Sequence, residues 1–293
     1  MAPLSTPLEH LLALLDLEEV GEDAFRGYSP PTAGRSVFGG QAIAQALVAT
    51  QRTVPADRPA HSLHGYFVLA GDPRTPIDFA VERVRDGKSF TTRRCIATQQ
   101  GHTIFSLEAS FQIVEEGFDH AFEPPSVPPP ESLDTTSALA TRLNSFLPRG
   151  VLERFEKASP LDIRFVDPEA MLGGATSGTT RQNIWFRIVD RLPDDDAIHK
   201  AVLAYLSDMT LLNTALAAHG RSIFDPTLQV ASLDHALWFH RSFRADDWLL
   251  YAQDSPNASG GRALTRGELF TRDGRLVASV AQEGLIRQRG PKI

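Results

Sequence analysis

The sequence predicts an α+β fold made of two similar halves, each with a long helix followed by an antiparallel sheet. Three stretches of the first half match stretches of the second half in the same order, which indicates one structural unit built twice. Asp86-Gly87 and Asp273-Gly274 lie between β-rich runs, as is typical of hairpins, and a further turn is predicted at Gln100-Gly101. The matched stretches are residues 39–47 with 207–215, 62–67 with 232–239, and 89–106 with 262–279.

The first half is expected to contain two helices and four strands. Ser5 and Thr6 can cap a short amphipathic helix that has Pro7 in its first turn. Residues 37–41 open a second helix, whose stretch 42–48 is small and apolar nearly all round and is therefore expected to be buried. Strands are predicted as an antiparallel meander at residues 62–69, 77–85, 89–99 and 103–112.

A stretch of different composition connects the two halves. Residues 123–130 are rich in proline, which cannot pair within the interior of a sheet. A helical pattern follows from residue 137 to about 157. We therefore expect an N-terminal domain at residues 1–115, a linker with a helix at 116–160, and a C-terminal domain at 161–293.

The second half repeats the order of the first. Its long helix is expected at residues 197–217, after the acidic residues 194–196, which favour a helix start. The helical pattern is interrupted near Ser207 and Asp208. Strands are predicted at residues 183–189, 228–239, 248–253, 262–270 and 276–286.

Composition restricts the classes of partner. The chain of 293 residues has 29 Lys and Arg against 36 Asp and Glu, so its net charge is −7, which disfavours binding to nucleic acid. Its single cysteine, Cys95, cannot form an internal disulfide. No apolar run reaches the roughly 20 residues that span a bilayer, and no basic segment precedes the first apolar stretch. We therefore expect a cytoplasmic enzyme with neither nucleic-acid nor membrane partners.

Familiar cofactor and nucleophile motifs are absent or misplaced. Residues 87–89 resemble the end of a phosphate-binding loop but lie in a hairpin, and there is no Gly-x-Ser-x-Gly elbow or Gly-x-Gly-x-x-Gly fingerprint. The spacings of His61 with His64 and of His235 with His240 place each pair on opposite faces of a strand, which does not suit one metal. We expect neither a metal nor a cofactor.

Three polar residues of the second half lie in apolar surroundings. Asp208 interrupts the long helix, Ser232 lies on a predicted inner strand, and Gln282 lies on the last strand. Taken singly, each is more simply explained as a helix cap or as a hydrogen-bonded strand residue. Together, a carboxylate, a hydroxyl and an amide provide the groups that hold one water and accept its proton.

At these residues the sequence closely resembles the type II acyl-CoA thioesterases, the group of bacterial thioesterase II and the peroxisomal thioesterases. The resemblance implies a double hot-dog fold, in which each of two tandem repeats wraps an antiparallel sheet around a long central helix. It also implies a catalytic triad that falls on Asp208, Ser232 and Gln282, although many relatives have Thr where Ser232 stands. The matching stretches are residues 37–41, 61–64, 85–90, 109–112, 233–235, 238–240, 248–251, 278–279 and 282–284.

The expected reaction is hydrolysis of acyl-CoA, of medium to long chain, to free fatty acid and CoA. Asp208 would take a proton from the attacking water, and the backbone at Gly40, in a turn formed by Gly39 and Gly40, would bind the substrate oxyanion. Leu211 and Leu212 would line the acyl-chain tunnel. The resemblance further implies a homo-oligomer.

Two other functions remain open from the sequence. Hot-dog enoyl-CoA hydratases typically pair an Asp with a His on the central helix, but Asn213 stands five residues after Asp208, and no His lies between Asp208 and Ala218. A non-catalytic acyl-CoA-binding protein could keep the same fold, although the intact set of three polar residues favours catalysis.

Overall fold

The computed structural model describes residues 6–30, 35–142, 159–171 and 178–289. By contacts, the chain forms two compact units. Unit 1 contains residues 1–120, 192–209 and 233–244, and unit 2 contains residues 121–191, 210–232 and 245–293. Each unit contains segments from both halves of the sequence, and the division into domains at residues 115 and 160 stays a prediction.

The sheet of unit 1 is antiparallel throughout and has the order β1-β2-β4-β5-β6-β3-β10. The four predicted strands are present, but β3 lies beside β6, so the predicted meander order was wrong for this strand. Pro73 and Pro76 follow β3, where no hairpin turn is encoded, and the chain instead crosses to the far side of β5 and β6. The short hairpin of β1 and β2 was not predicted. The strands are β1 (Glu18–Gly21), β2 (Ala24–Gly27), β3 (Ala60–Phe67), β4 (Ile77–Asp86), β5 (Phe90–Gln99), β6 (His102–Gln112) and β10 (Asp234–Phe239).

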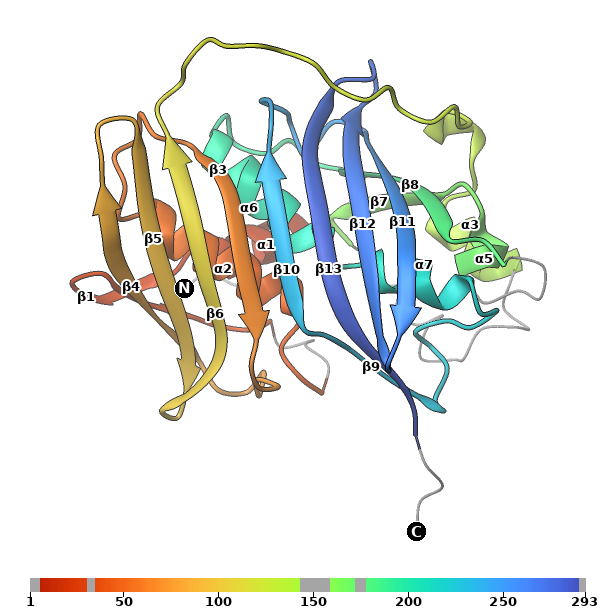
Figure 1. Ribbon diagram of the computed structural model, residues 1–293, viewed down its shortest axis with the longest axis horizontal. Helices are drawn as coiled ribbons and strands as arrows, with labels where there is room; N and C mark the ends of the chain where they lie inside the picture. Colours follow the sequence, from red (N-terminus) through yellow and green to blue (C-terminus); the bar gives the residue numbers. More distant parts are fainter. Residues whose placement is uncertain (1–5, 31–34, 143–158, 172–177, 290–293) are drawn as a thin grey trace. The chain divides into compact units, whose positions relative to one another are not determined.

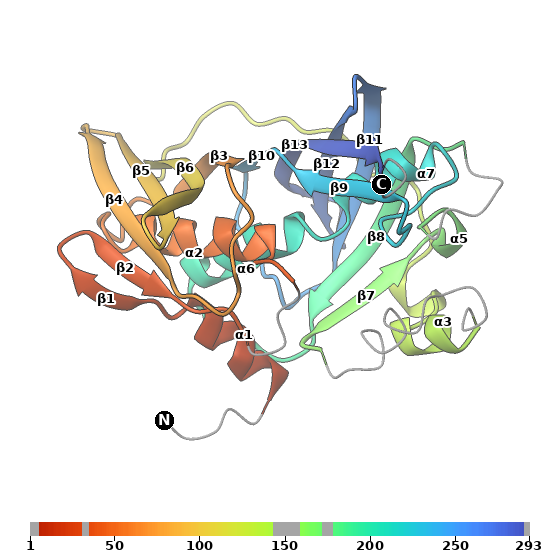
Figure 2. The ribbon, with the colours of Figure 1, turned by 90° about the horizontal axis from the view of Figure 1, so that it is seen from below.

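Three helices belong to unit 1: α1 (Pro7–Leu15), α2 (Gly39–Gln51) and α6 (Asp196–Ser207). Thr6 and Glu9 form a capping box at α1, which confirms the predicted start; Ser5 lies outside the described residues. The predicted buried helix is α2, which lies against strands β3 to β6 and beside α6 (Figure 2). The side chain of Asp195 caps α6, so the acidic segment does begin this helix.

The sheet of unit 2 has the order β13-β12-β11-β8-β7, and β9 pairs with β13. Helix α7 (Leu211–Ala217) lies against β11, β12 and β13 (Figure 1). The single strand predicted at residues 228–239 was wrong, because β9 ends at Ser232 and β10 begins at Asp234, where pairing changes from β13 to β3. The strands are β7 (Leu161–Phe165), β8 (Arg181–Ile188), β9 (Leu228–Ser232), β11 (Leu249–Ser259), β12 (Arg262–Thr271) and β13 (Leu276–Gln288).

The proline-rich connection packs on the sheet of unit 2 instead of standing free. The indole nitrogen of Trp185 donates a hydrogen bond to the carbonyl oxygen of Pro128 at 3.0 Å. Val127 and Leu133 pack against a buried cluster that contains Trp185. After the short 3₁₀ turn η1 (Pro130–Ser132) comes α3 (Thr136–Arg142); the rest of the helix predicted up to residue 157 lies outside the described residues. Helix α5 (Pro168–Met171) was not predicted.

Both units contain the same ladder of three antiparallel strands, β4-β5-β6 in unit 1 and β11-β12-β13 in unit 2. Gln100 and Gly101 have positive φ angles of 50° and 80° in the β5–β6 turn, and Gly274 has a φ of 89° in the β12–β13 turn. These are the hairpin turns that the sequence predicted. Of the helices that the structure describes, none combines the length and hydropathy needed to span a membrane.

Candidate active site

Asp208 lies at the point where the long helix is interrupted. It is the C-terminal cap of α6, its backbone N–H donates to the carbonyl of Leu206, and its side chain is half-buried. The simpler explanation, that Asp208 caps the start of a new helical segment, was wrong, because Asp208 ends α6 and Thr210 is the N-terminal cap of α7. The Asp208 side chain belongs to unit 1.

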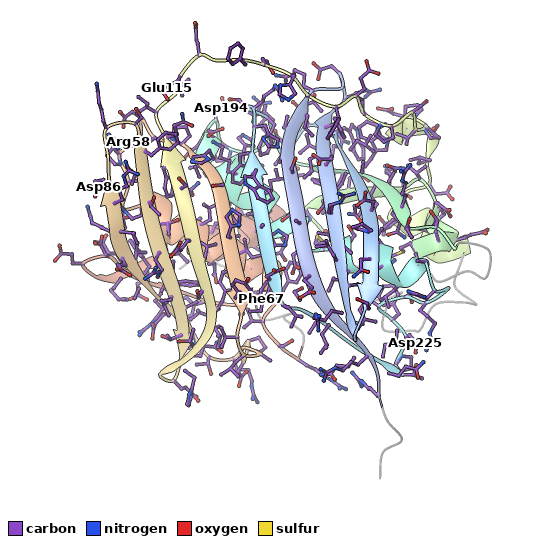
Figure 3. All side chains as sticks on the ribbon, viewed as in Figure 1. Arg58, Phe67, Asp86, Glu115, Asp194 and Asp225 are labelled. Carbon is purple, nitrogen blue, oxygen red and sulfur yellow. The ribbon has the colours of Figure 1, made fainter. Side chains whose placement is uncertain are left out.

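The neighbour of that carboxylate is the start of α2. A Cβ atom added at Gly39 would lie 2.5 Å from Oδ2 of Asp208 and 3.0 Å from the ring of Phe67, which lies at the end of β3 (Figure 3). At Gly40 it would overlap the carbonyl oxygen of Tyr205 in α6. Both glycines are needed because α2 and the end of α6 approach closely here. Gly39 and Gly40 form the first residues of α2, not the turn that was predicted.

Ser232 and Gln282 come together in unit 2. Nε2 of Gln282 donates a hydrogen bond to Oγ of Ser232, with the two atoms 2.6 Å apart. The Gln282 side chain is 1% exposed, and its backbone carbonyl accepts a hydrogen bond from Thr265. Ser232 is the last residue of β9 and lies opposite Gly284 of β13. Two of the three predicted site residues are therefore in contact, and the participation of Asp208 with them stays a prediction.

An apolar side chain lies next to this pair. Gly284 is on β13 two residues after Gln282, and a Cβ atom there would overlap the side chain of Leu212 from α7. Leu211 and Leu212 are both buried. In unit 2, α7 thus rests directly on the strand that carries Gln282, with a leucine beside the hydrogen-bonded pair.

A buried serine–histidine contact was not predicted. Oγ of Ser207 lies 2.9 Å from Nε2 of His235, and both residues are buried. The Ser207 hydroxyl also donates to the carbonyl of Ala204 at 3.0 Å, so the proton of the serine–histidine bond comes from the imidazole. His235 therefore does not act as a base on Ser207, and this contact is not a serine nucleophile. In the sequence, the feature that could have indicated this contact is Ser207, a small polar residue in an otherwise apolar helix.

The other histidines occupy separate environments. His61 bonds to Oγ of Ser110, and burial, with a smaller contribution from Lys200, lowers its pKa. His64 is exposed and packs edge-on against Trp238. Within the parts of the chain that the structure describes, no group of three or more His, Cys, Asp or Glu side chains is placed to hold a metal ion.

Asn213 lies where a hydratase of this fold would be expected to carry its histidine. Its amide donates to the carbonyl of Met171 at 3.0 Å and accepts from the backbone N–H of Ile223 at 3.1 Å. The side chain is buried and holds α7 to the segments around it. This structural use of Asn213 does not favour hydration of an enoyl-CoA.

Comparisons with known proteins agree with this arrangement. Residues 28–112 match the family model described as the acyl-CoA thioesterase N-terminal domain, and residues 153–285 match the model described as acyl-CoA thioesterase. The chain is 38% identical to "Acyl-CoA thioesterase 2" of Haemophilus influenzae, over 97% of this chain and 99% of the relative. It is 42% identical to "Acyl-coenzyme A thioesterase 8" of Rattus norvegicus, over 94% of this chain and 88% of the relative.

Solved structures show the same fold. The crystal structure of the acyl-CoA thioesterase II TesB2 from Mycobacterium marinum matches with a TM-score of 0.78 and 44% identity, covering 95% of this chain and 98% of that one. A protein from Alicyclobacillus acidocaldarius, described as having a hot-dog fold, matches with a TM-score of 0.75 at 18% identity, over 95% of this chain and 98% of that one; this likeness concerns the fold alone. The predicted double hot-dog architecture is confirmed, and the chain belongs to the acyl-CoA thioesterase family.

Proposed function

We propose that this acyl-CoA thioesterase hydrolyses medium- to long-chain acyl-CoA with a water molecule that is activated by Asp208 and oriented by Ser232 and Gln282. The observation that carries the proposal is the 2.6 Å hydrogen bond from Gln282 to Ser232. In this bond the Gln282 amide donates and the Ser232 hydroxyl oxygen accepts. A buried amide that fixes a hydroxyl on a β-strand is well suited to orient a small polar ligand.

The proposed reaction has no covalent enzyme intermediate. The Asp208 carboxylate accepts a proton as the oxygen of water forms a bond to the thioester carbonyl carbon. The tetrahedral oxyanion then collapses, the carbon–sulfur bond breaks, and the proton passes to the CoA thiolate or to solvent. General-base catalysis of this kind contributes about 10²–10⁴-fold in rate.

The backbone at the start of α2 is the proposed oxyanion site, with Gly40 as the substrate-binding residue. The first N–H groups of a helix have no partner within the helix, and they carry partial positive charge. The Asp208 carboxylate lies against Gly39, so the start of α2 is close to the proposed base, which supports this proposal. The acyl chain would follow the apolar side chain of Leu212.

The function is tested by measuring thiol release from short-, medium- and long-chain acyl-CoA beside hydration of crotonyl-CoA. We expect hydrolysis that is fastest for medium or long chains, with no hydration. Hydration without thiol release would identify a hydratase, and tight acyl-CoA binding without turnover would identify a binding protein. Fastest turnover of the shortest substrates would contradict the proposed chain length.

The family resemblance and the composition also support a cytoplasmic homo-oligomer with no cofactor. The oligomeric state is measured by light scattering on the purified protein, and the location by fractionation of cells that express it. A monomer in solution, or recovery with membranes, would contradict these two points.

A further inference from the structure

Helices α6 and α7 are joined by three residues, Asp208, Met209 and Thr210. This connector lies outside both helices and contains the proposed general base, Asp208. The position of the Asp208 backbone, from which the carboxylate extends, therefore depends on what holds the residues on either side of it. Buried polar side chains from the sheets bind on both sides.

On the N-terminal side, the anchor is in unit 1. Ser207, the last residue of α6, accepts a hydrogen bond from Nε2 of His235 at 2.9 Å, as its own hydroxyl donates to Ala204. Ser207 is fully buried, and His235 is 1% exposed on strand β10. The residue immediately before Asp208 is thus tied to the sheet through a side chain that has no contact with bulk solvent.

On the C-terminal side, the anchor is in unit 2. Nε2 of Gln253, on strand β11, donates to Oγ1 of Thr210 at 2.6 Å. Oε1 of the same amide accepts from Oγ1 of Thr214 at 2.8 Å. Gln253 is 2% exposed and Thr214 is fully buried. One amide therefore spans the first turn of α7 and fixes the residue at which the connector ends.

Gln182 extends this network without reaching the connector. Its Oε1 lies 3.2 Å from the Thr214 hydroxyl, which has one hydrogen and already makes the shorter bond to Gln253. Among the residues that the structure describes, Nε2 of Gln182 has no hydrogen-bond partner. Gln253, not Gln182, is therefore the side chain that links the sheet to Thr210.

We infer that His235 and Gln253 are positioning residues for the reaction, acting through Ser207 and Thr210 to fix the direction of the Asp208 carboxylate. The inference rests on the proposed function of Asp208 as the base. Neither side chain takes part in the chemistry. Small displacements of a catalytic group lower the rate steeply, so loss of an anchor affects the chemical step more than substrate binding.

The test uses four variants. Gln253→Met and Ser207→Ala each remove one anchor, and Thr210→Val removes the hydroxyl that Gln253 holds, whereas Thr210→Ser retains it. We expect the first three to lower kcat about 10–100-fold, with KM within about twofold of the wild type. Thr210→Ser should restore kcat to near the wild-type value.

Asn213→Leu is the matched control. Asn213 lies on α7 and is as deeply buried as Gln253, and its side chain makes two hydrogen bonds, neither of which goes to the connector. This variant should lower the melting temperature as much as Gln253→Met does while it keeps kcat within about twofold of the wild type. A similar fall of kcat in Asn213→Leu would show that loss of stability alone explains the Gln253 effect, and it would overturn the inference.

A double-mutant cycle separates the inference from the proposed function. If Gln253 acts through Asp208, Gln253→Met should have no further effect on kcat in an Asp208→Asn background. Multiplicative losses, or a Gln253→Met variant with normal kcat beside an impaired Asp208→Asn, would overturn the positioning role and leave Asp208 as the base. Near-normal kcat in Asp208→Asn would overturn both.

Discussion

Replacing Gly39 by alanine tests whether the direction of the Asp208 carboxylate matters for catalysis. The added methyl would lie 2.5 Å from Oδ2 of Asp208, roughly an ångström short of an ordinary contact, and 3.0 Å from the Phe67 ring. The Phe67 ring closes off that side, so the carboxylate is the group that must move. A displacement of about this size in a catalytic group costs on the order of 10²-fold in rate.

The cost to stability should be much smaller. Overpacking a close contact destabilises by about 1–3 kcal/mol. Alanine is a better helix former than glycine by up to about 1 kcal/mol, which offsets part of that loss in α2. We therefore expect Gly39→Ala to fold, with a kcat about 100-fold lower and a modest fall in melting temperature. The assays are thiol release from a long-chain acyl-CoA and thermal unfolding.

Two other glycine substitutions serve as controls for Gly39→Ala. A Cβ atom at Gly117 meets nothing within 4 Å, so Gly117→Ala should change neither kcat nor stability. At Gly40 the Cβ would overlap a backbone oxygen, which cannot rotate away, so Gly40→Ala should mainly lose stability. Normal folding and wild-type kcat in Gly39→Ala would refute the dependence of catalysis on the direction of the Asp208 carboxylate, because the carboxylate would then have moved without consequence.

Further outcomes are expected for four single groups. Asp208→Asn should lower kcat about 10²–10⁴-fold and Ser232→Ala by less, because the carboxylate remains; the opposite ranking would reverse their assigned functions. Burial raises the pKa of Glu268, so the stability that its protonated form gives at low pH is lost as the pH rises through the folded-state pKa. Glu268→Gln, which keeps an acceptor for the Ser279 hydroxyl, should raise the melting temperature at pH 8 and have little effect at pH 4, below the ordinary pKa of a glutamate; an equal gain at both would contradict this. Cys95 is fully buried and burial raises its thiol pKa, so the native protein should not react with a thiol reagent, and denaturation should expose one thiol per chain.

The sequence predicted most reliably the features that are determined by neighbouring residues. Thr6 and Glu9 lie three apart and cap α1 by themselves, and the Gln100-Gly101 turn adopts the positive φ angles that its composition permits. The order of strands could not be predicted in the same way. The place of β3 beside β6 depends on burial across the sheet, which no short window of sequence records.

The same contrast between local and distant determinants applies to the residues of the candidate site. Ser232 and Gln282 each stood out by their apolar surroundings, but they are separated by 50 residues, and no local pattern records that they meet. The repeat matched Gly39 and Gly40 to Ser207 and Asp208, but the close approach of Gly39 to the Asp208 carboxylate was not foreseen. Ser207 and Gln253 were missed because a single Ser or Gln in an apolar stretch has no distinctive local pattern.

In each unit, a proposed site residue occupies a position where a different residue would suit the fold better. Glycine at the start of α2 costs helix stability, yet the space that a side chain would fill at Gly39 is taken by the Asp208 carboxylate. Gln282 is 1% exposed on a strand whose inner neighbours are apolar or small, where an aliphatic side chain would bury without needing a partner. Local rules of this kind are broken mainly where function requires it. If stability were the only constraint, Gln282→Leu should be as stable as the wild type, so a variant that keeps its melting temperature but loses turnover would identify Gln282 as a residue retained for chemistry.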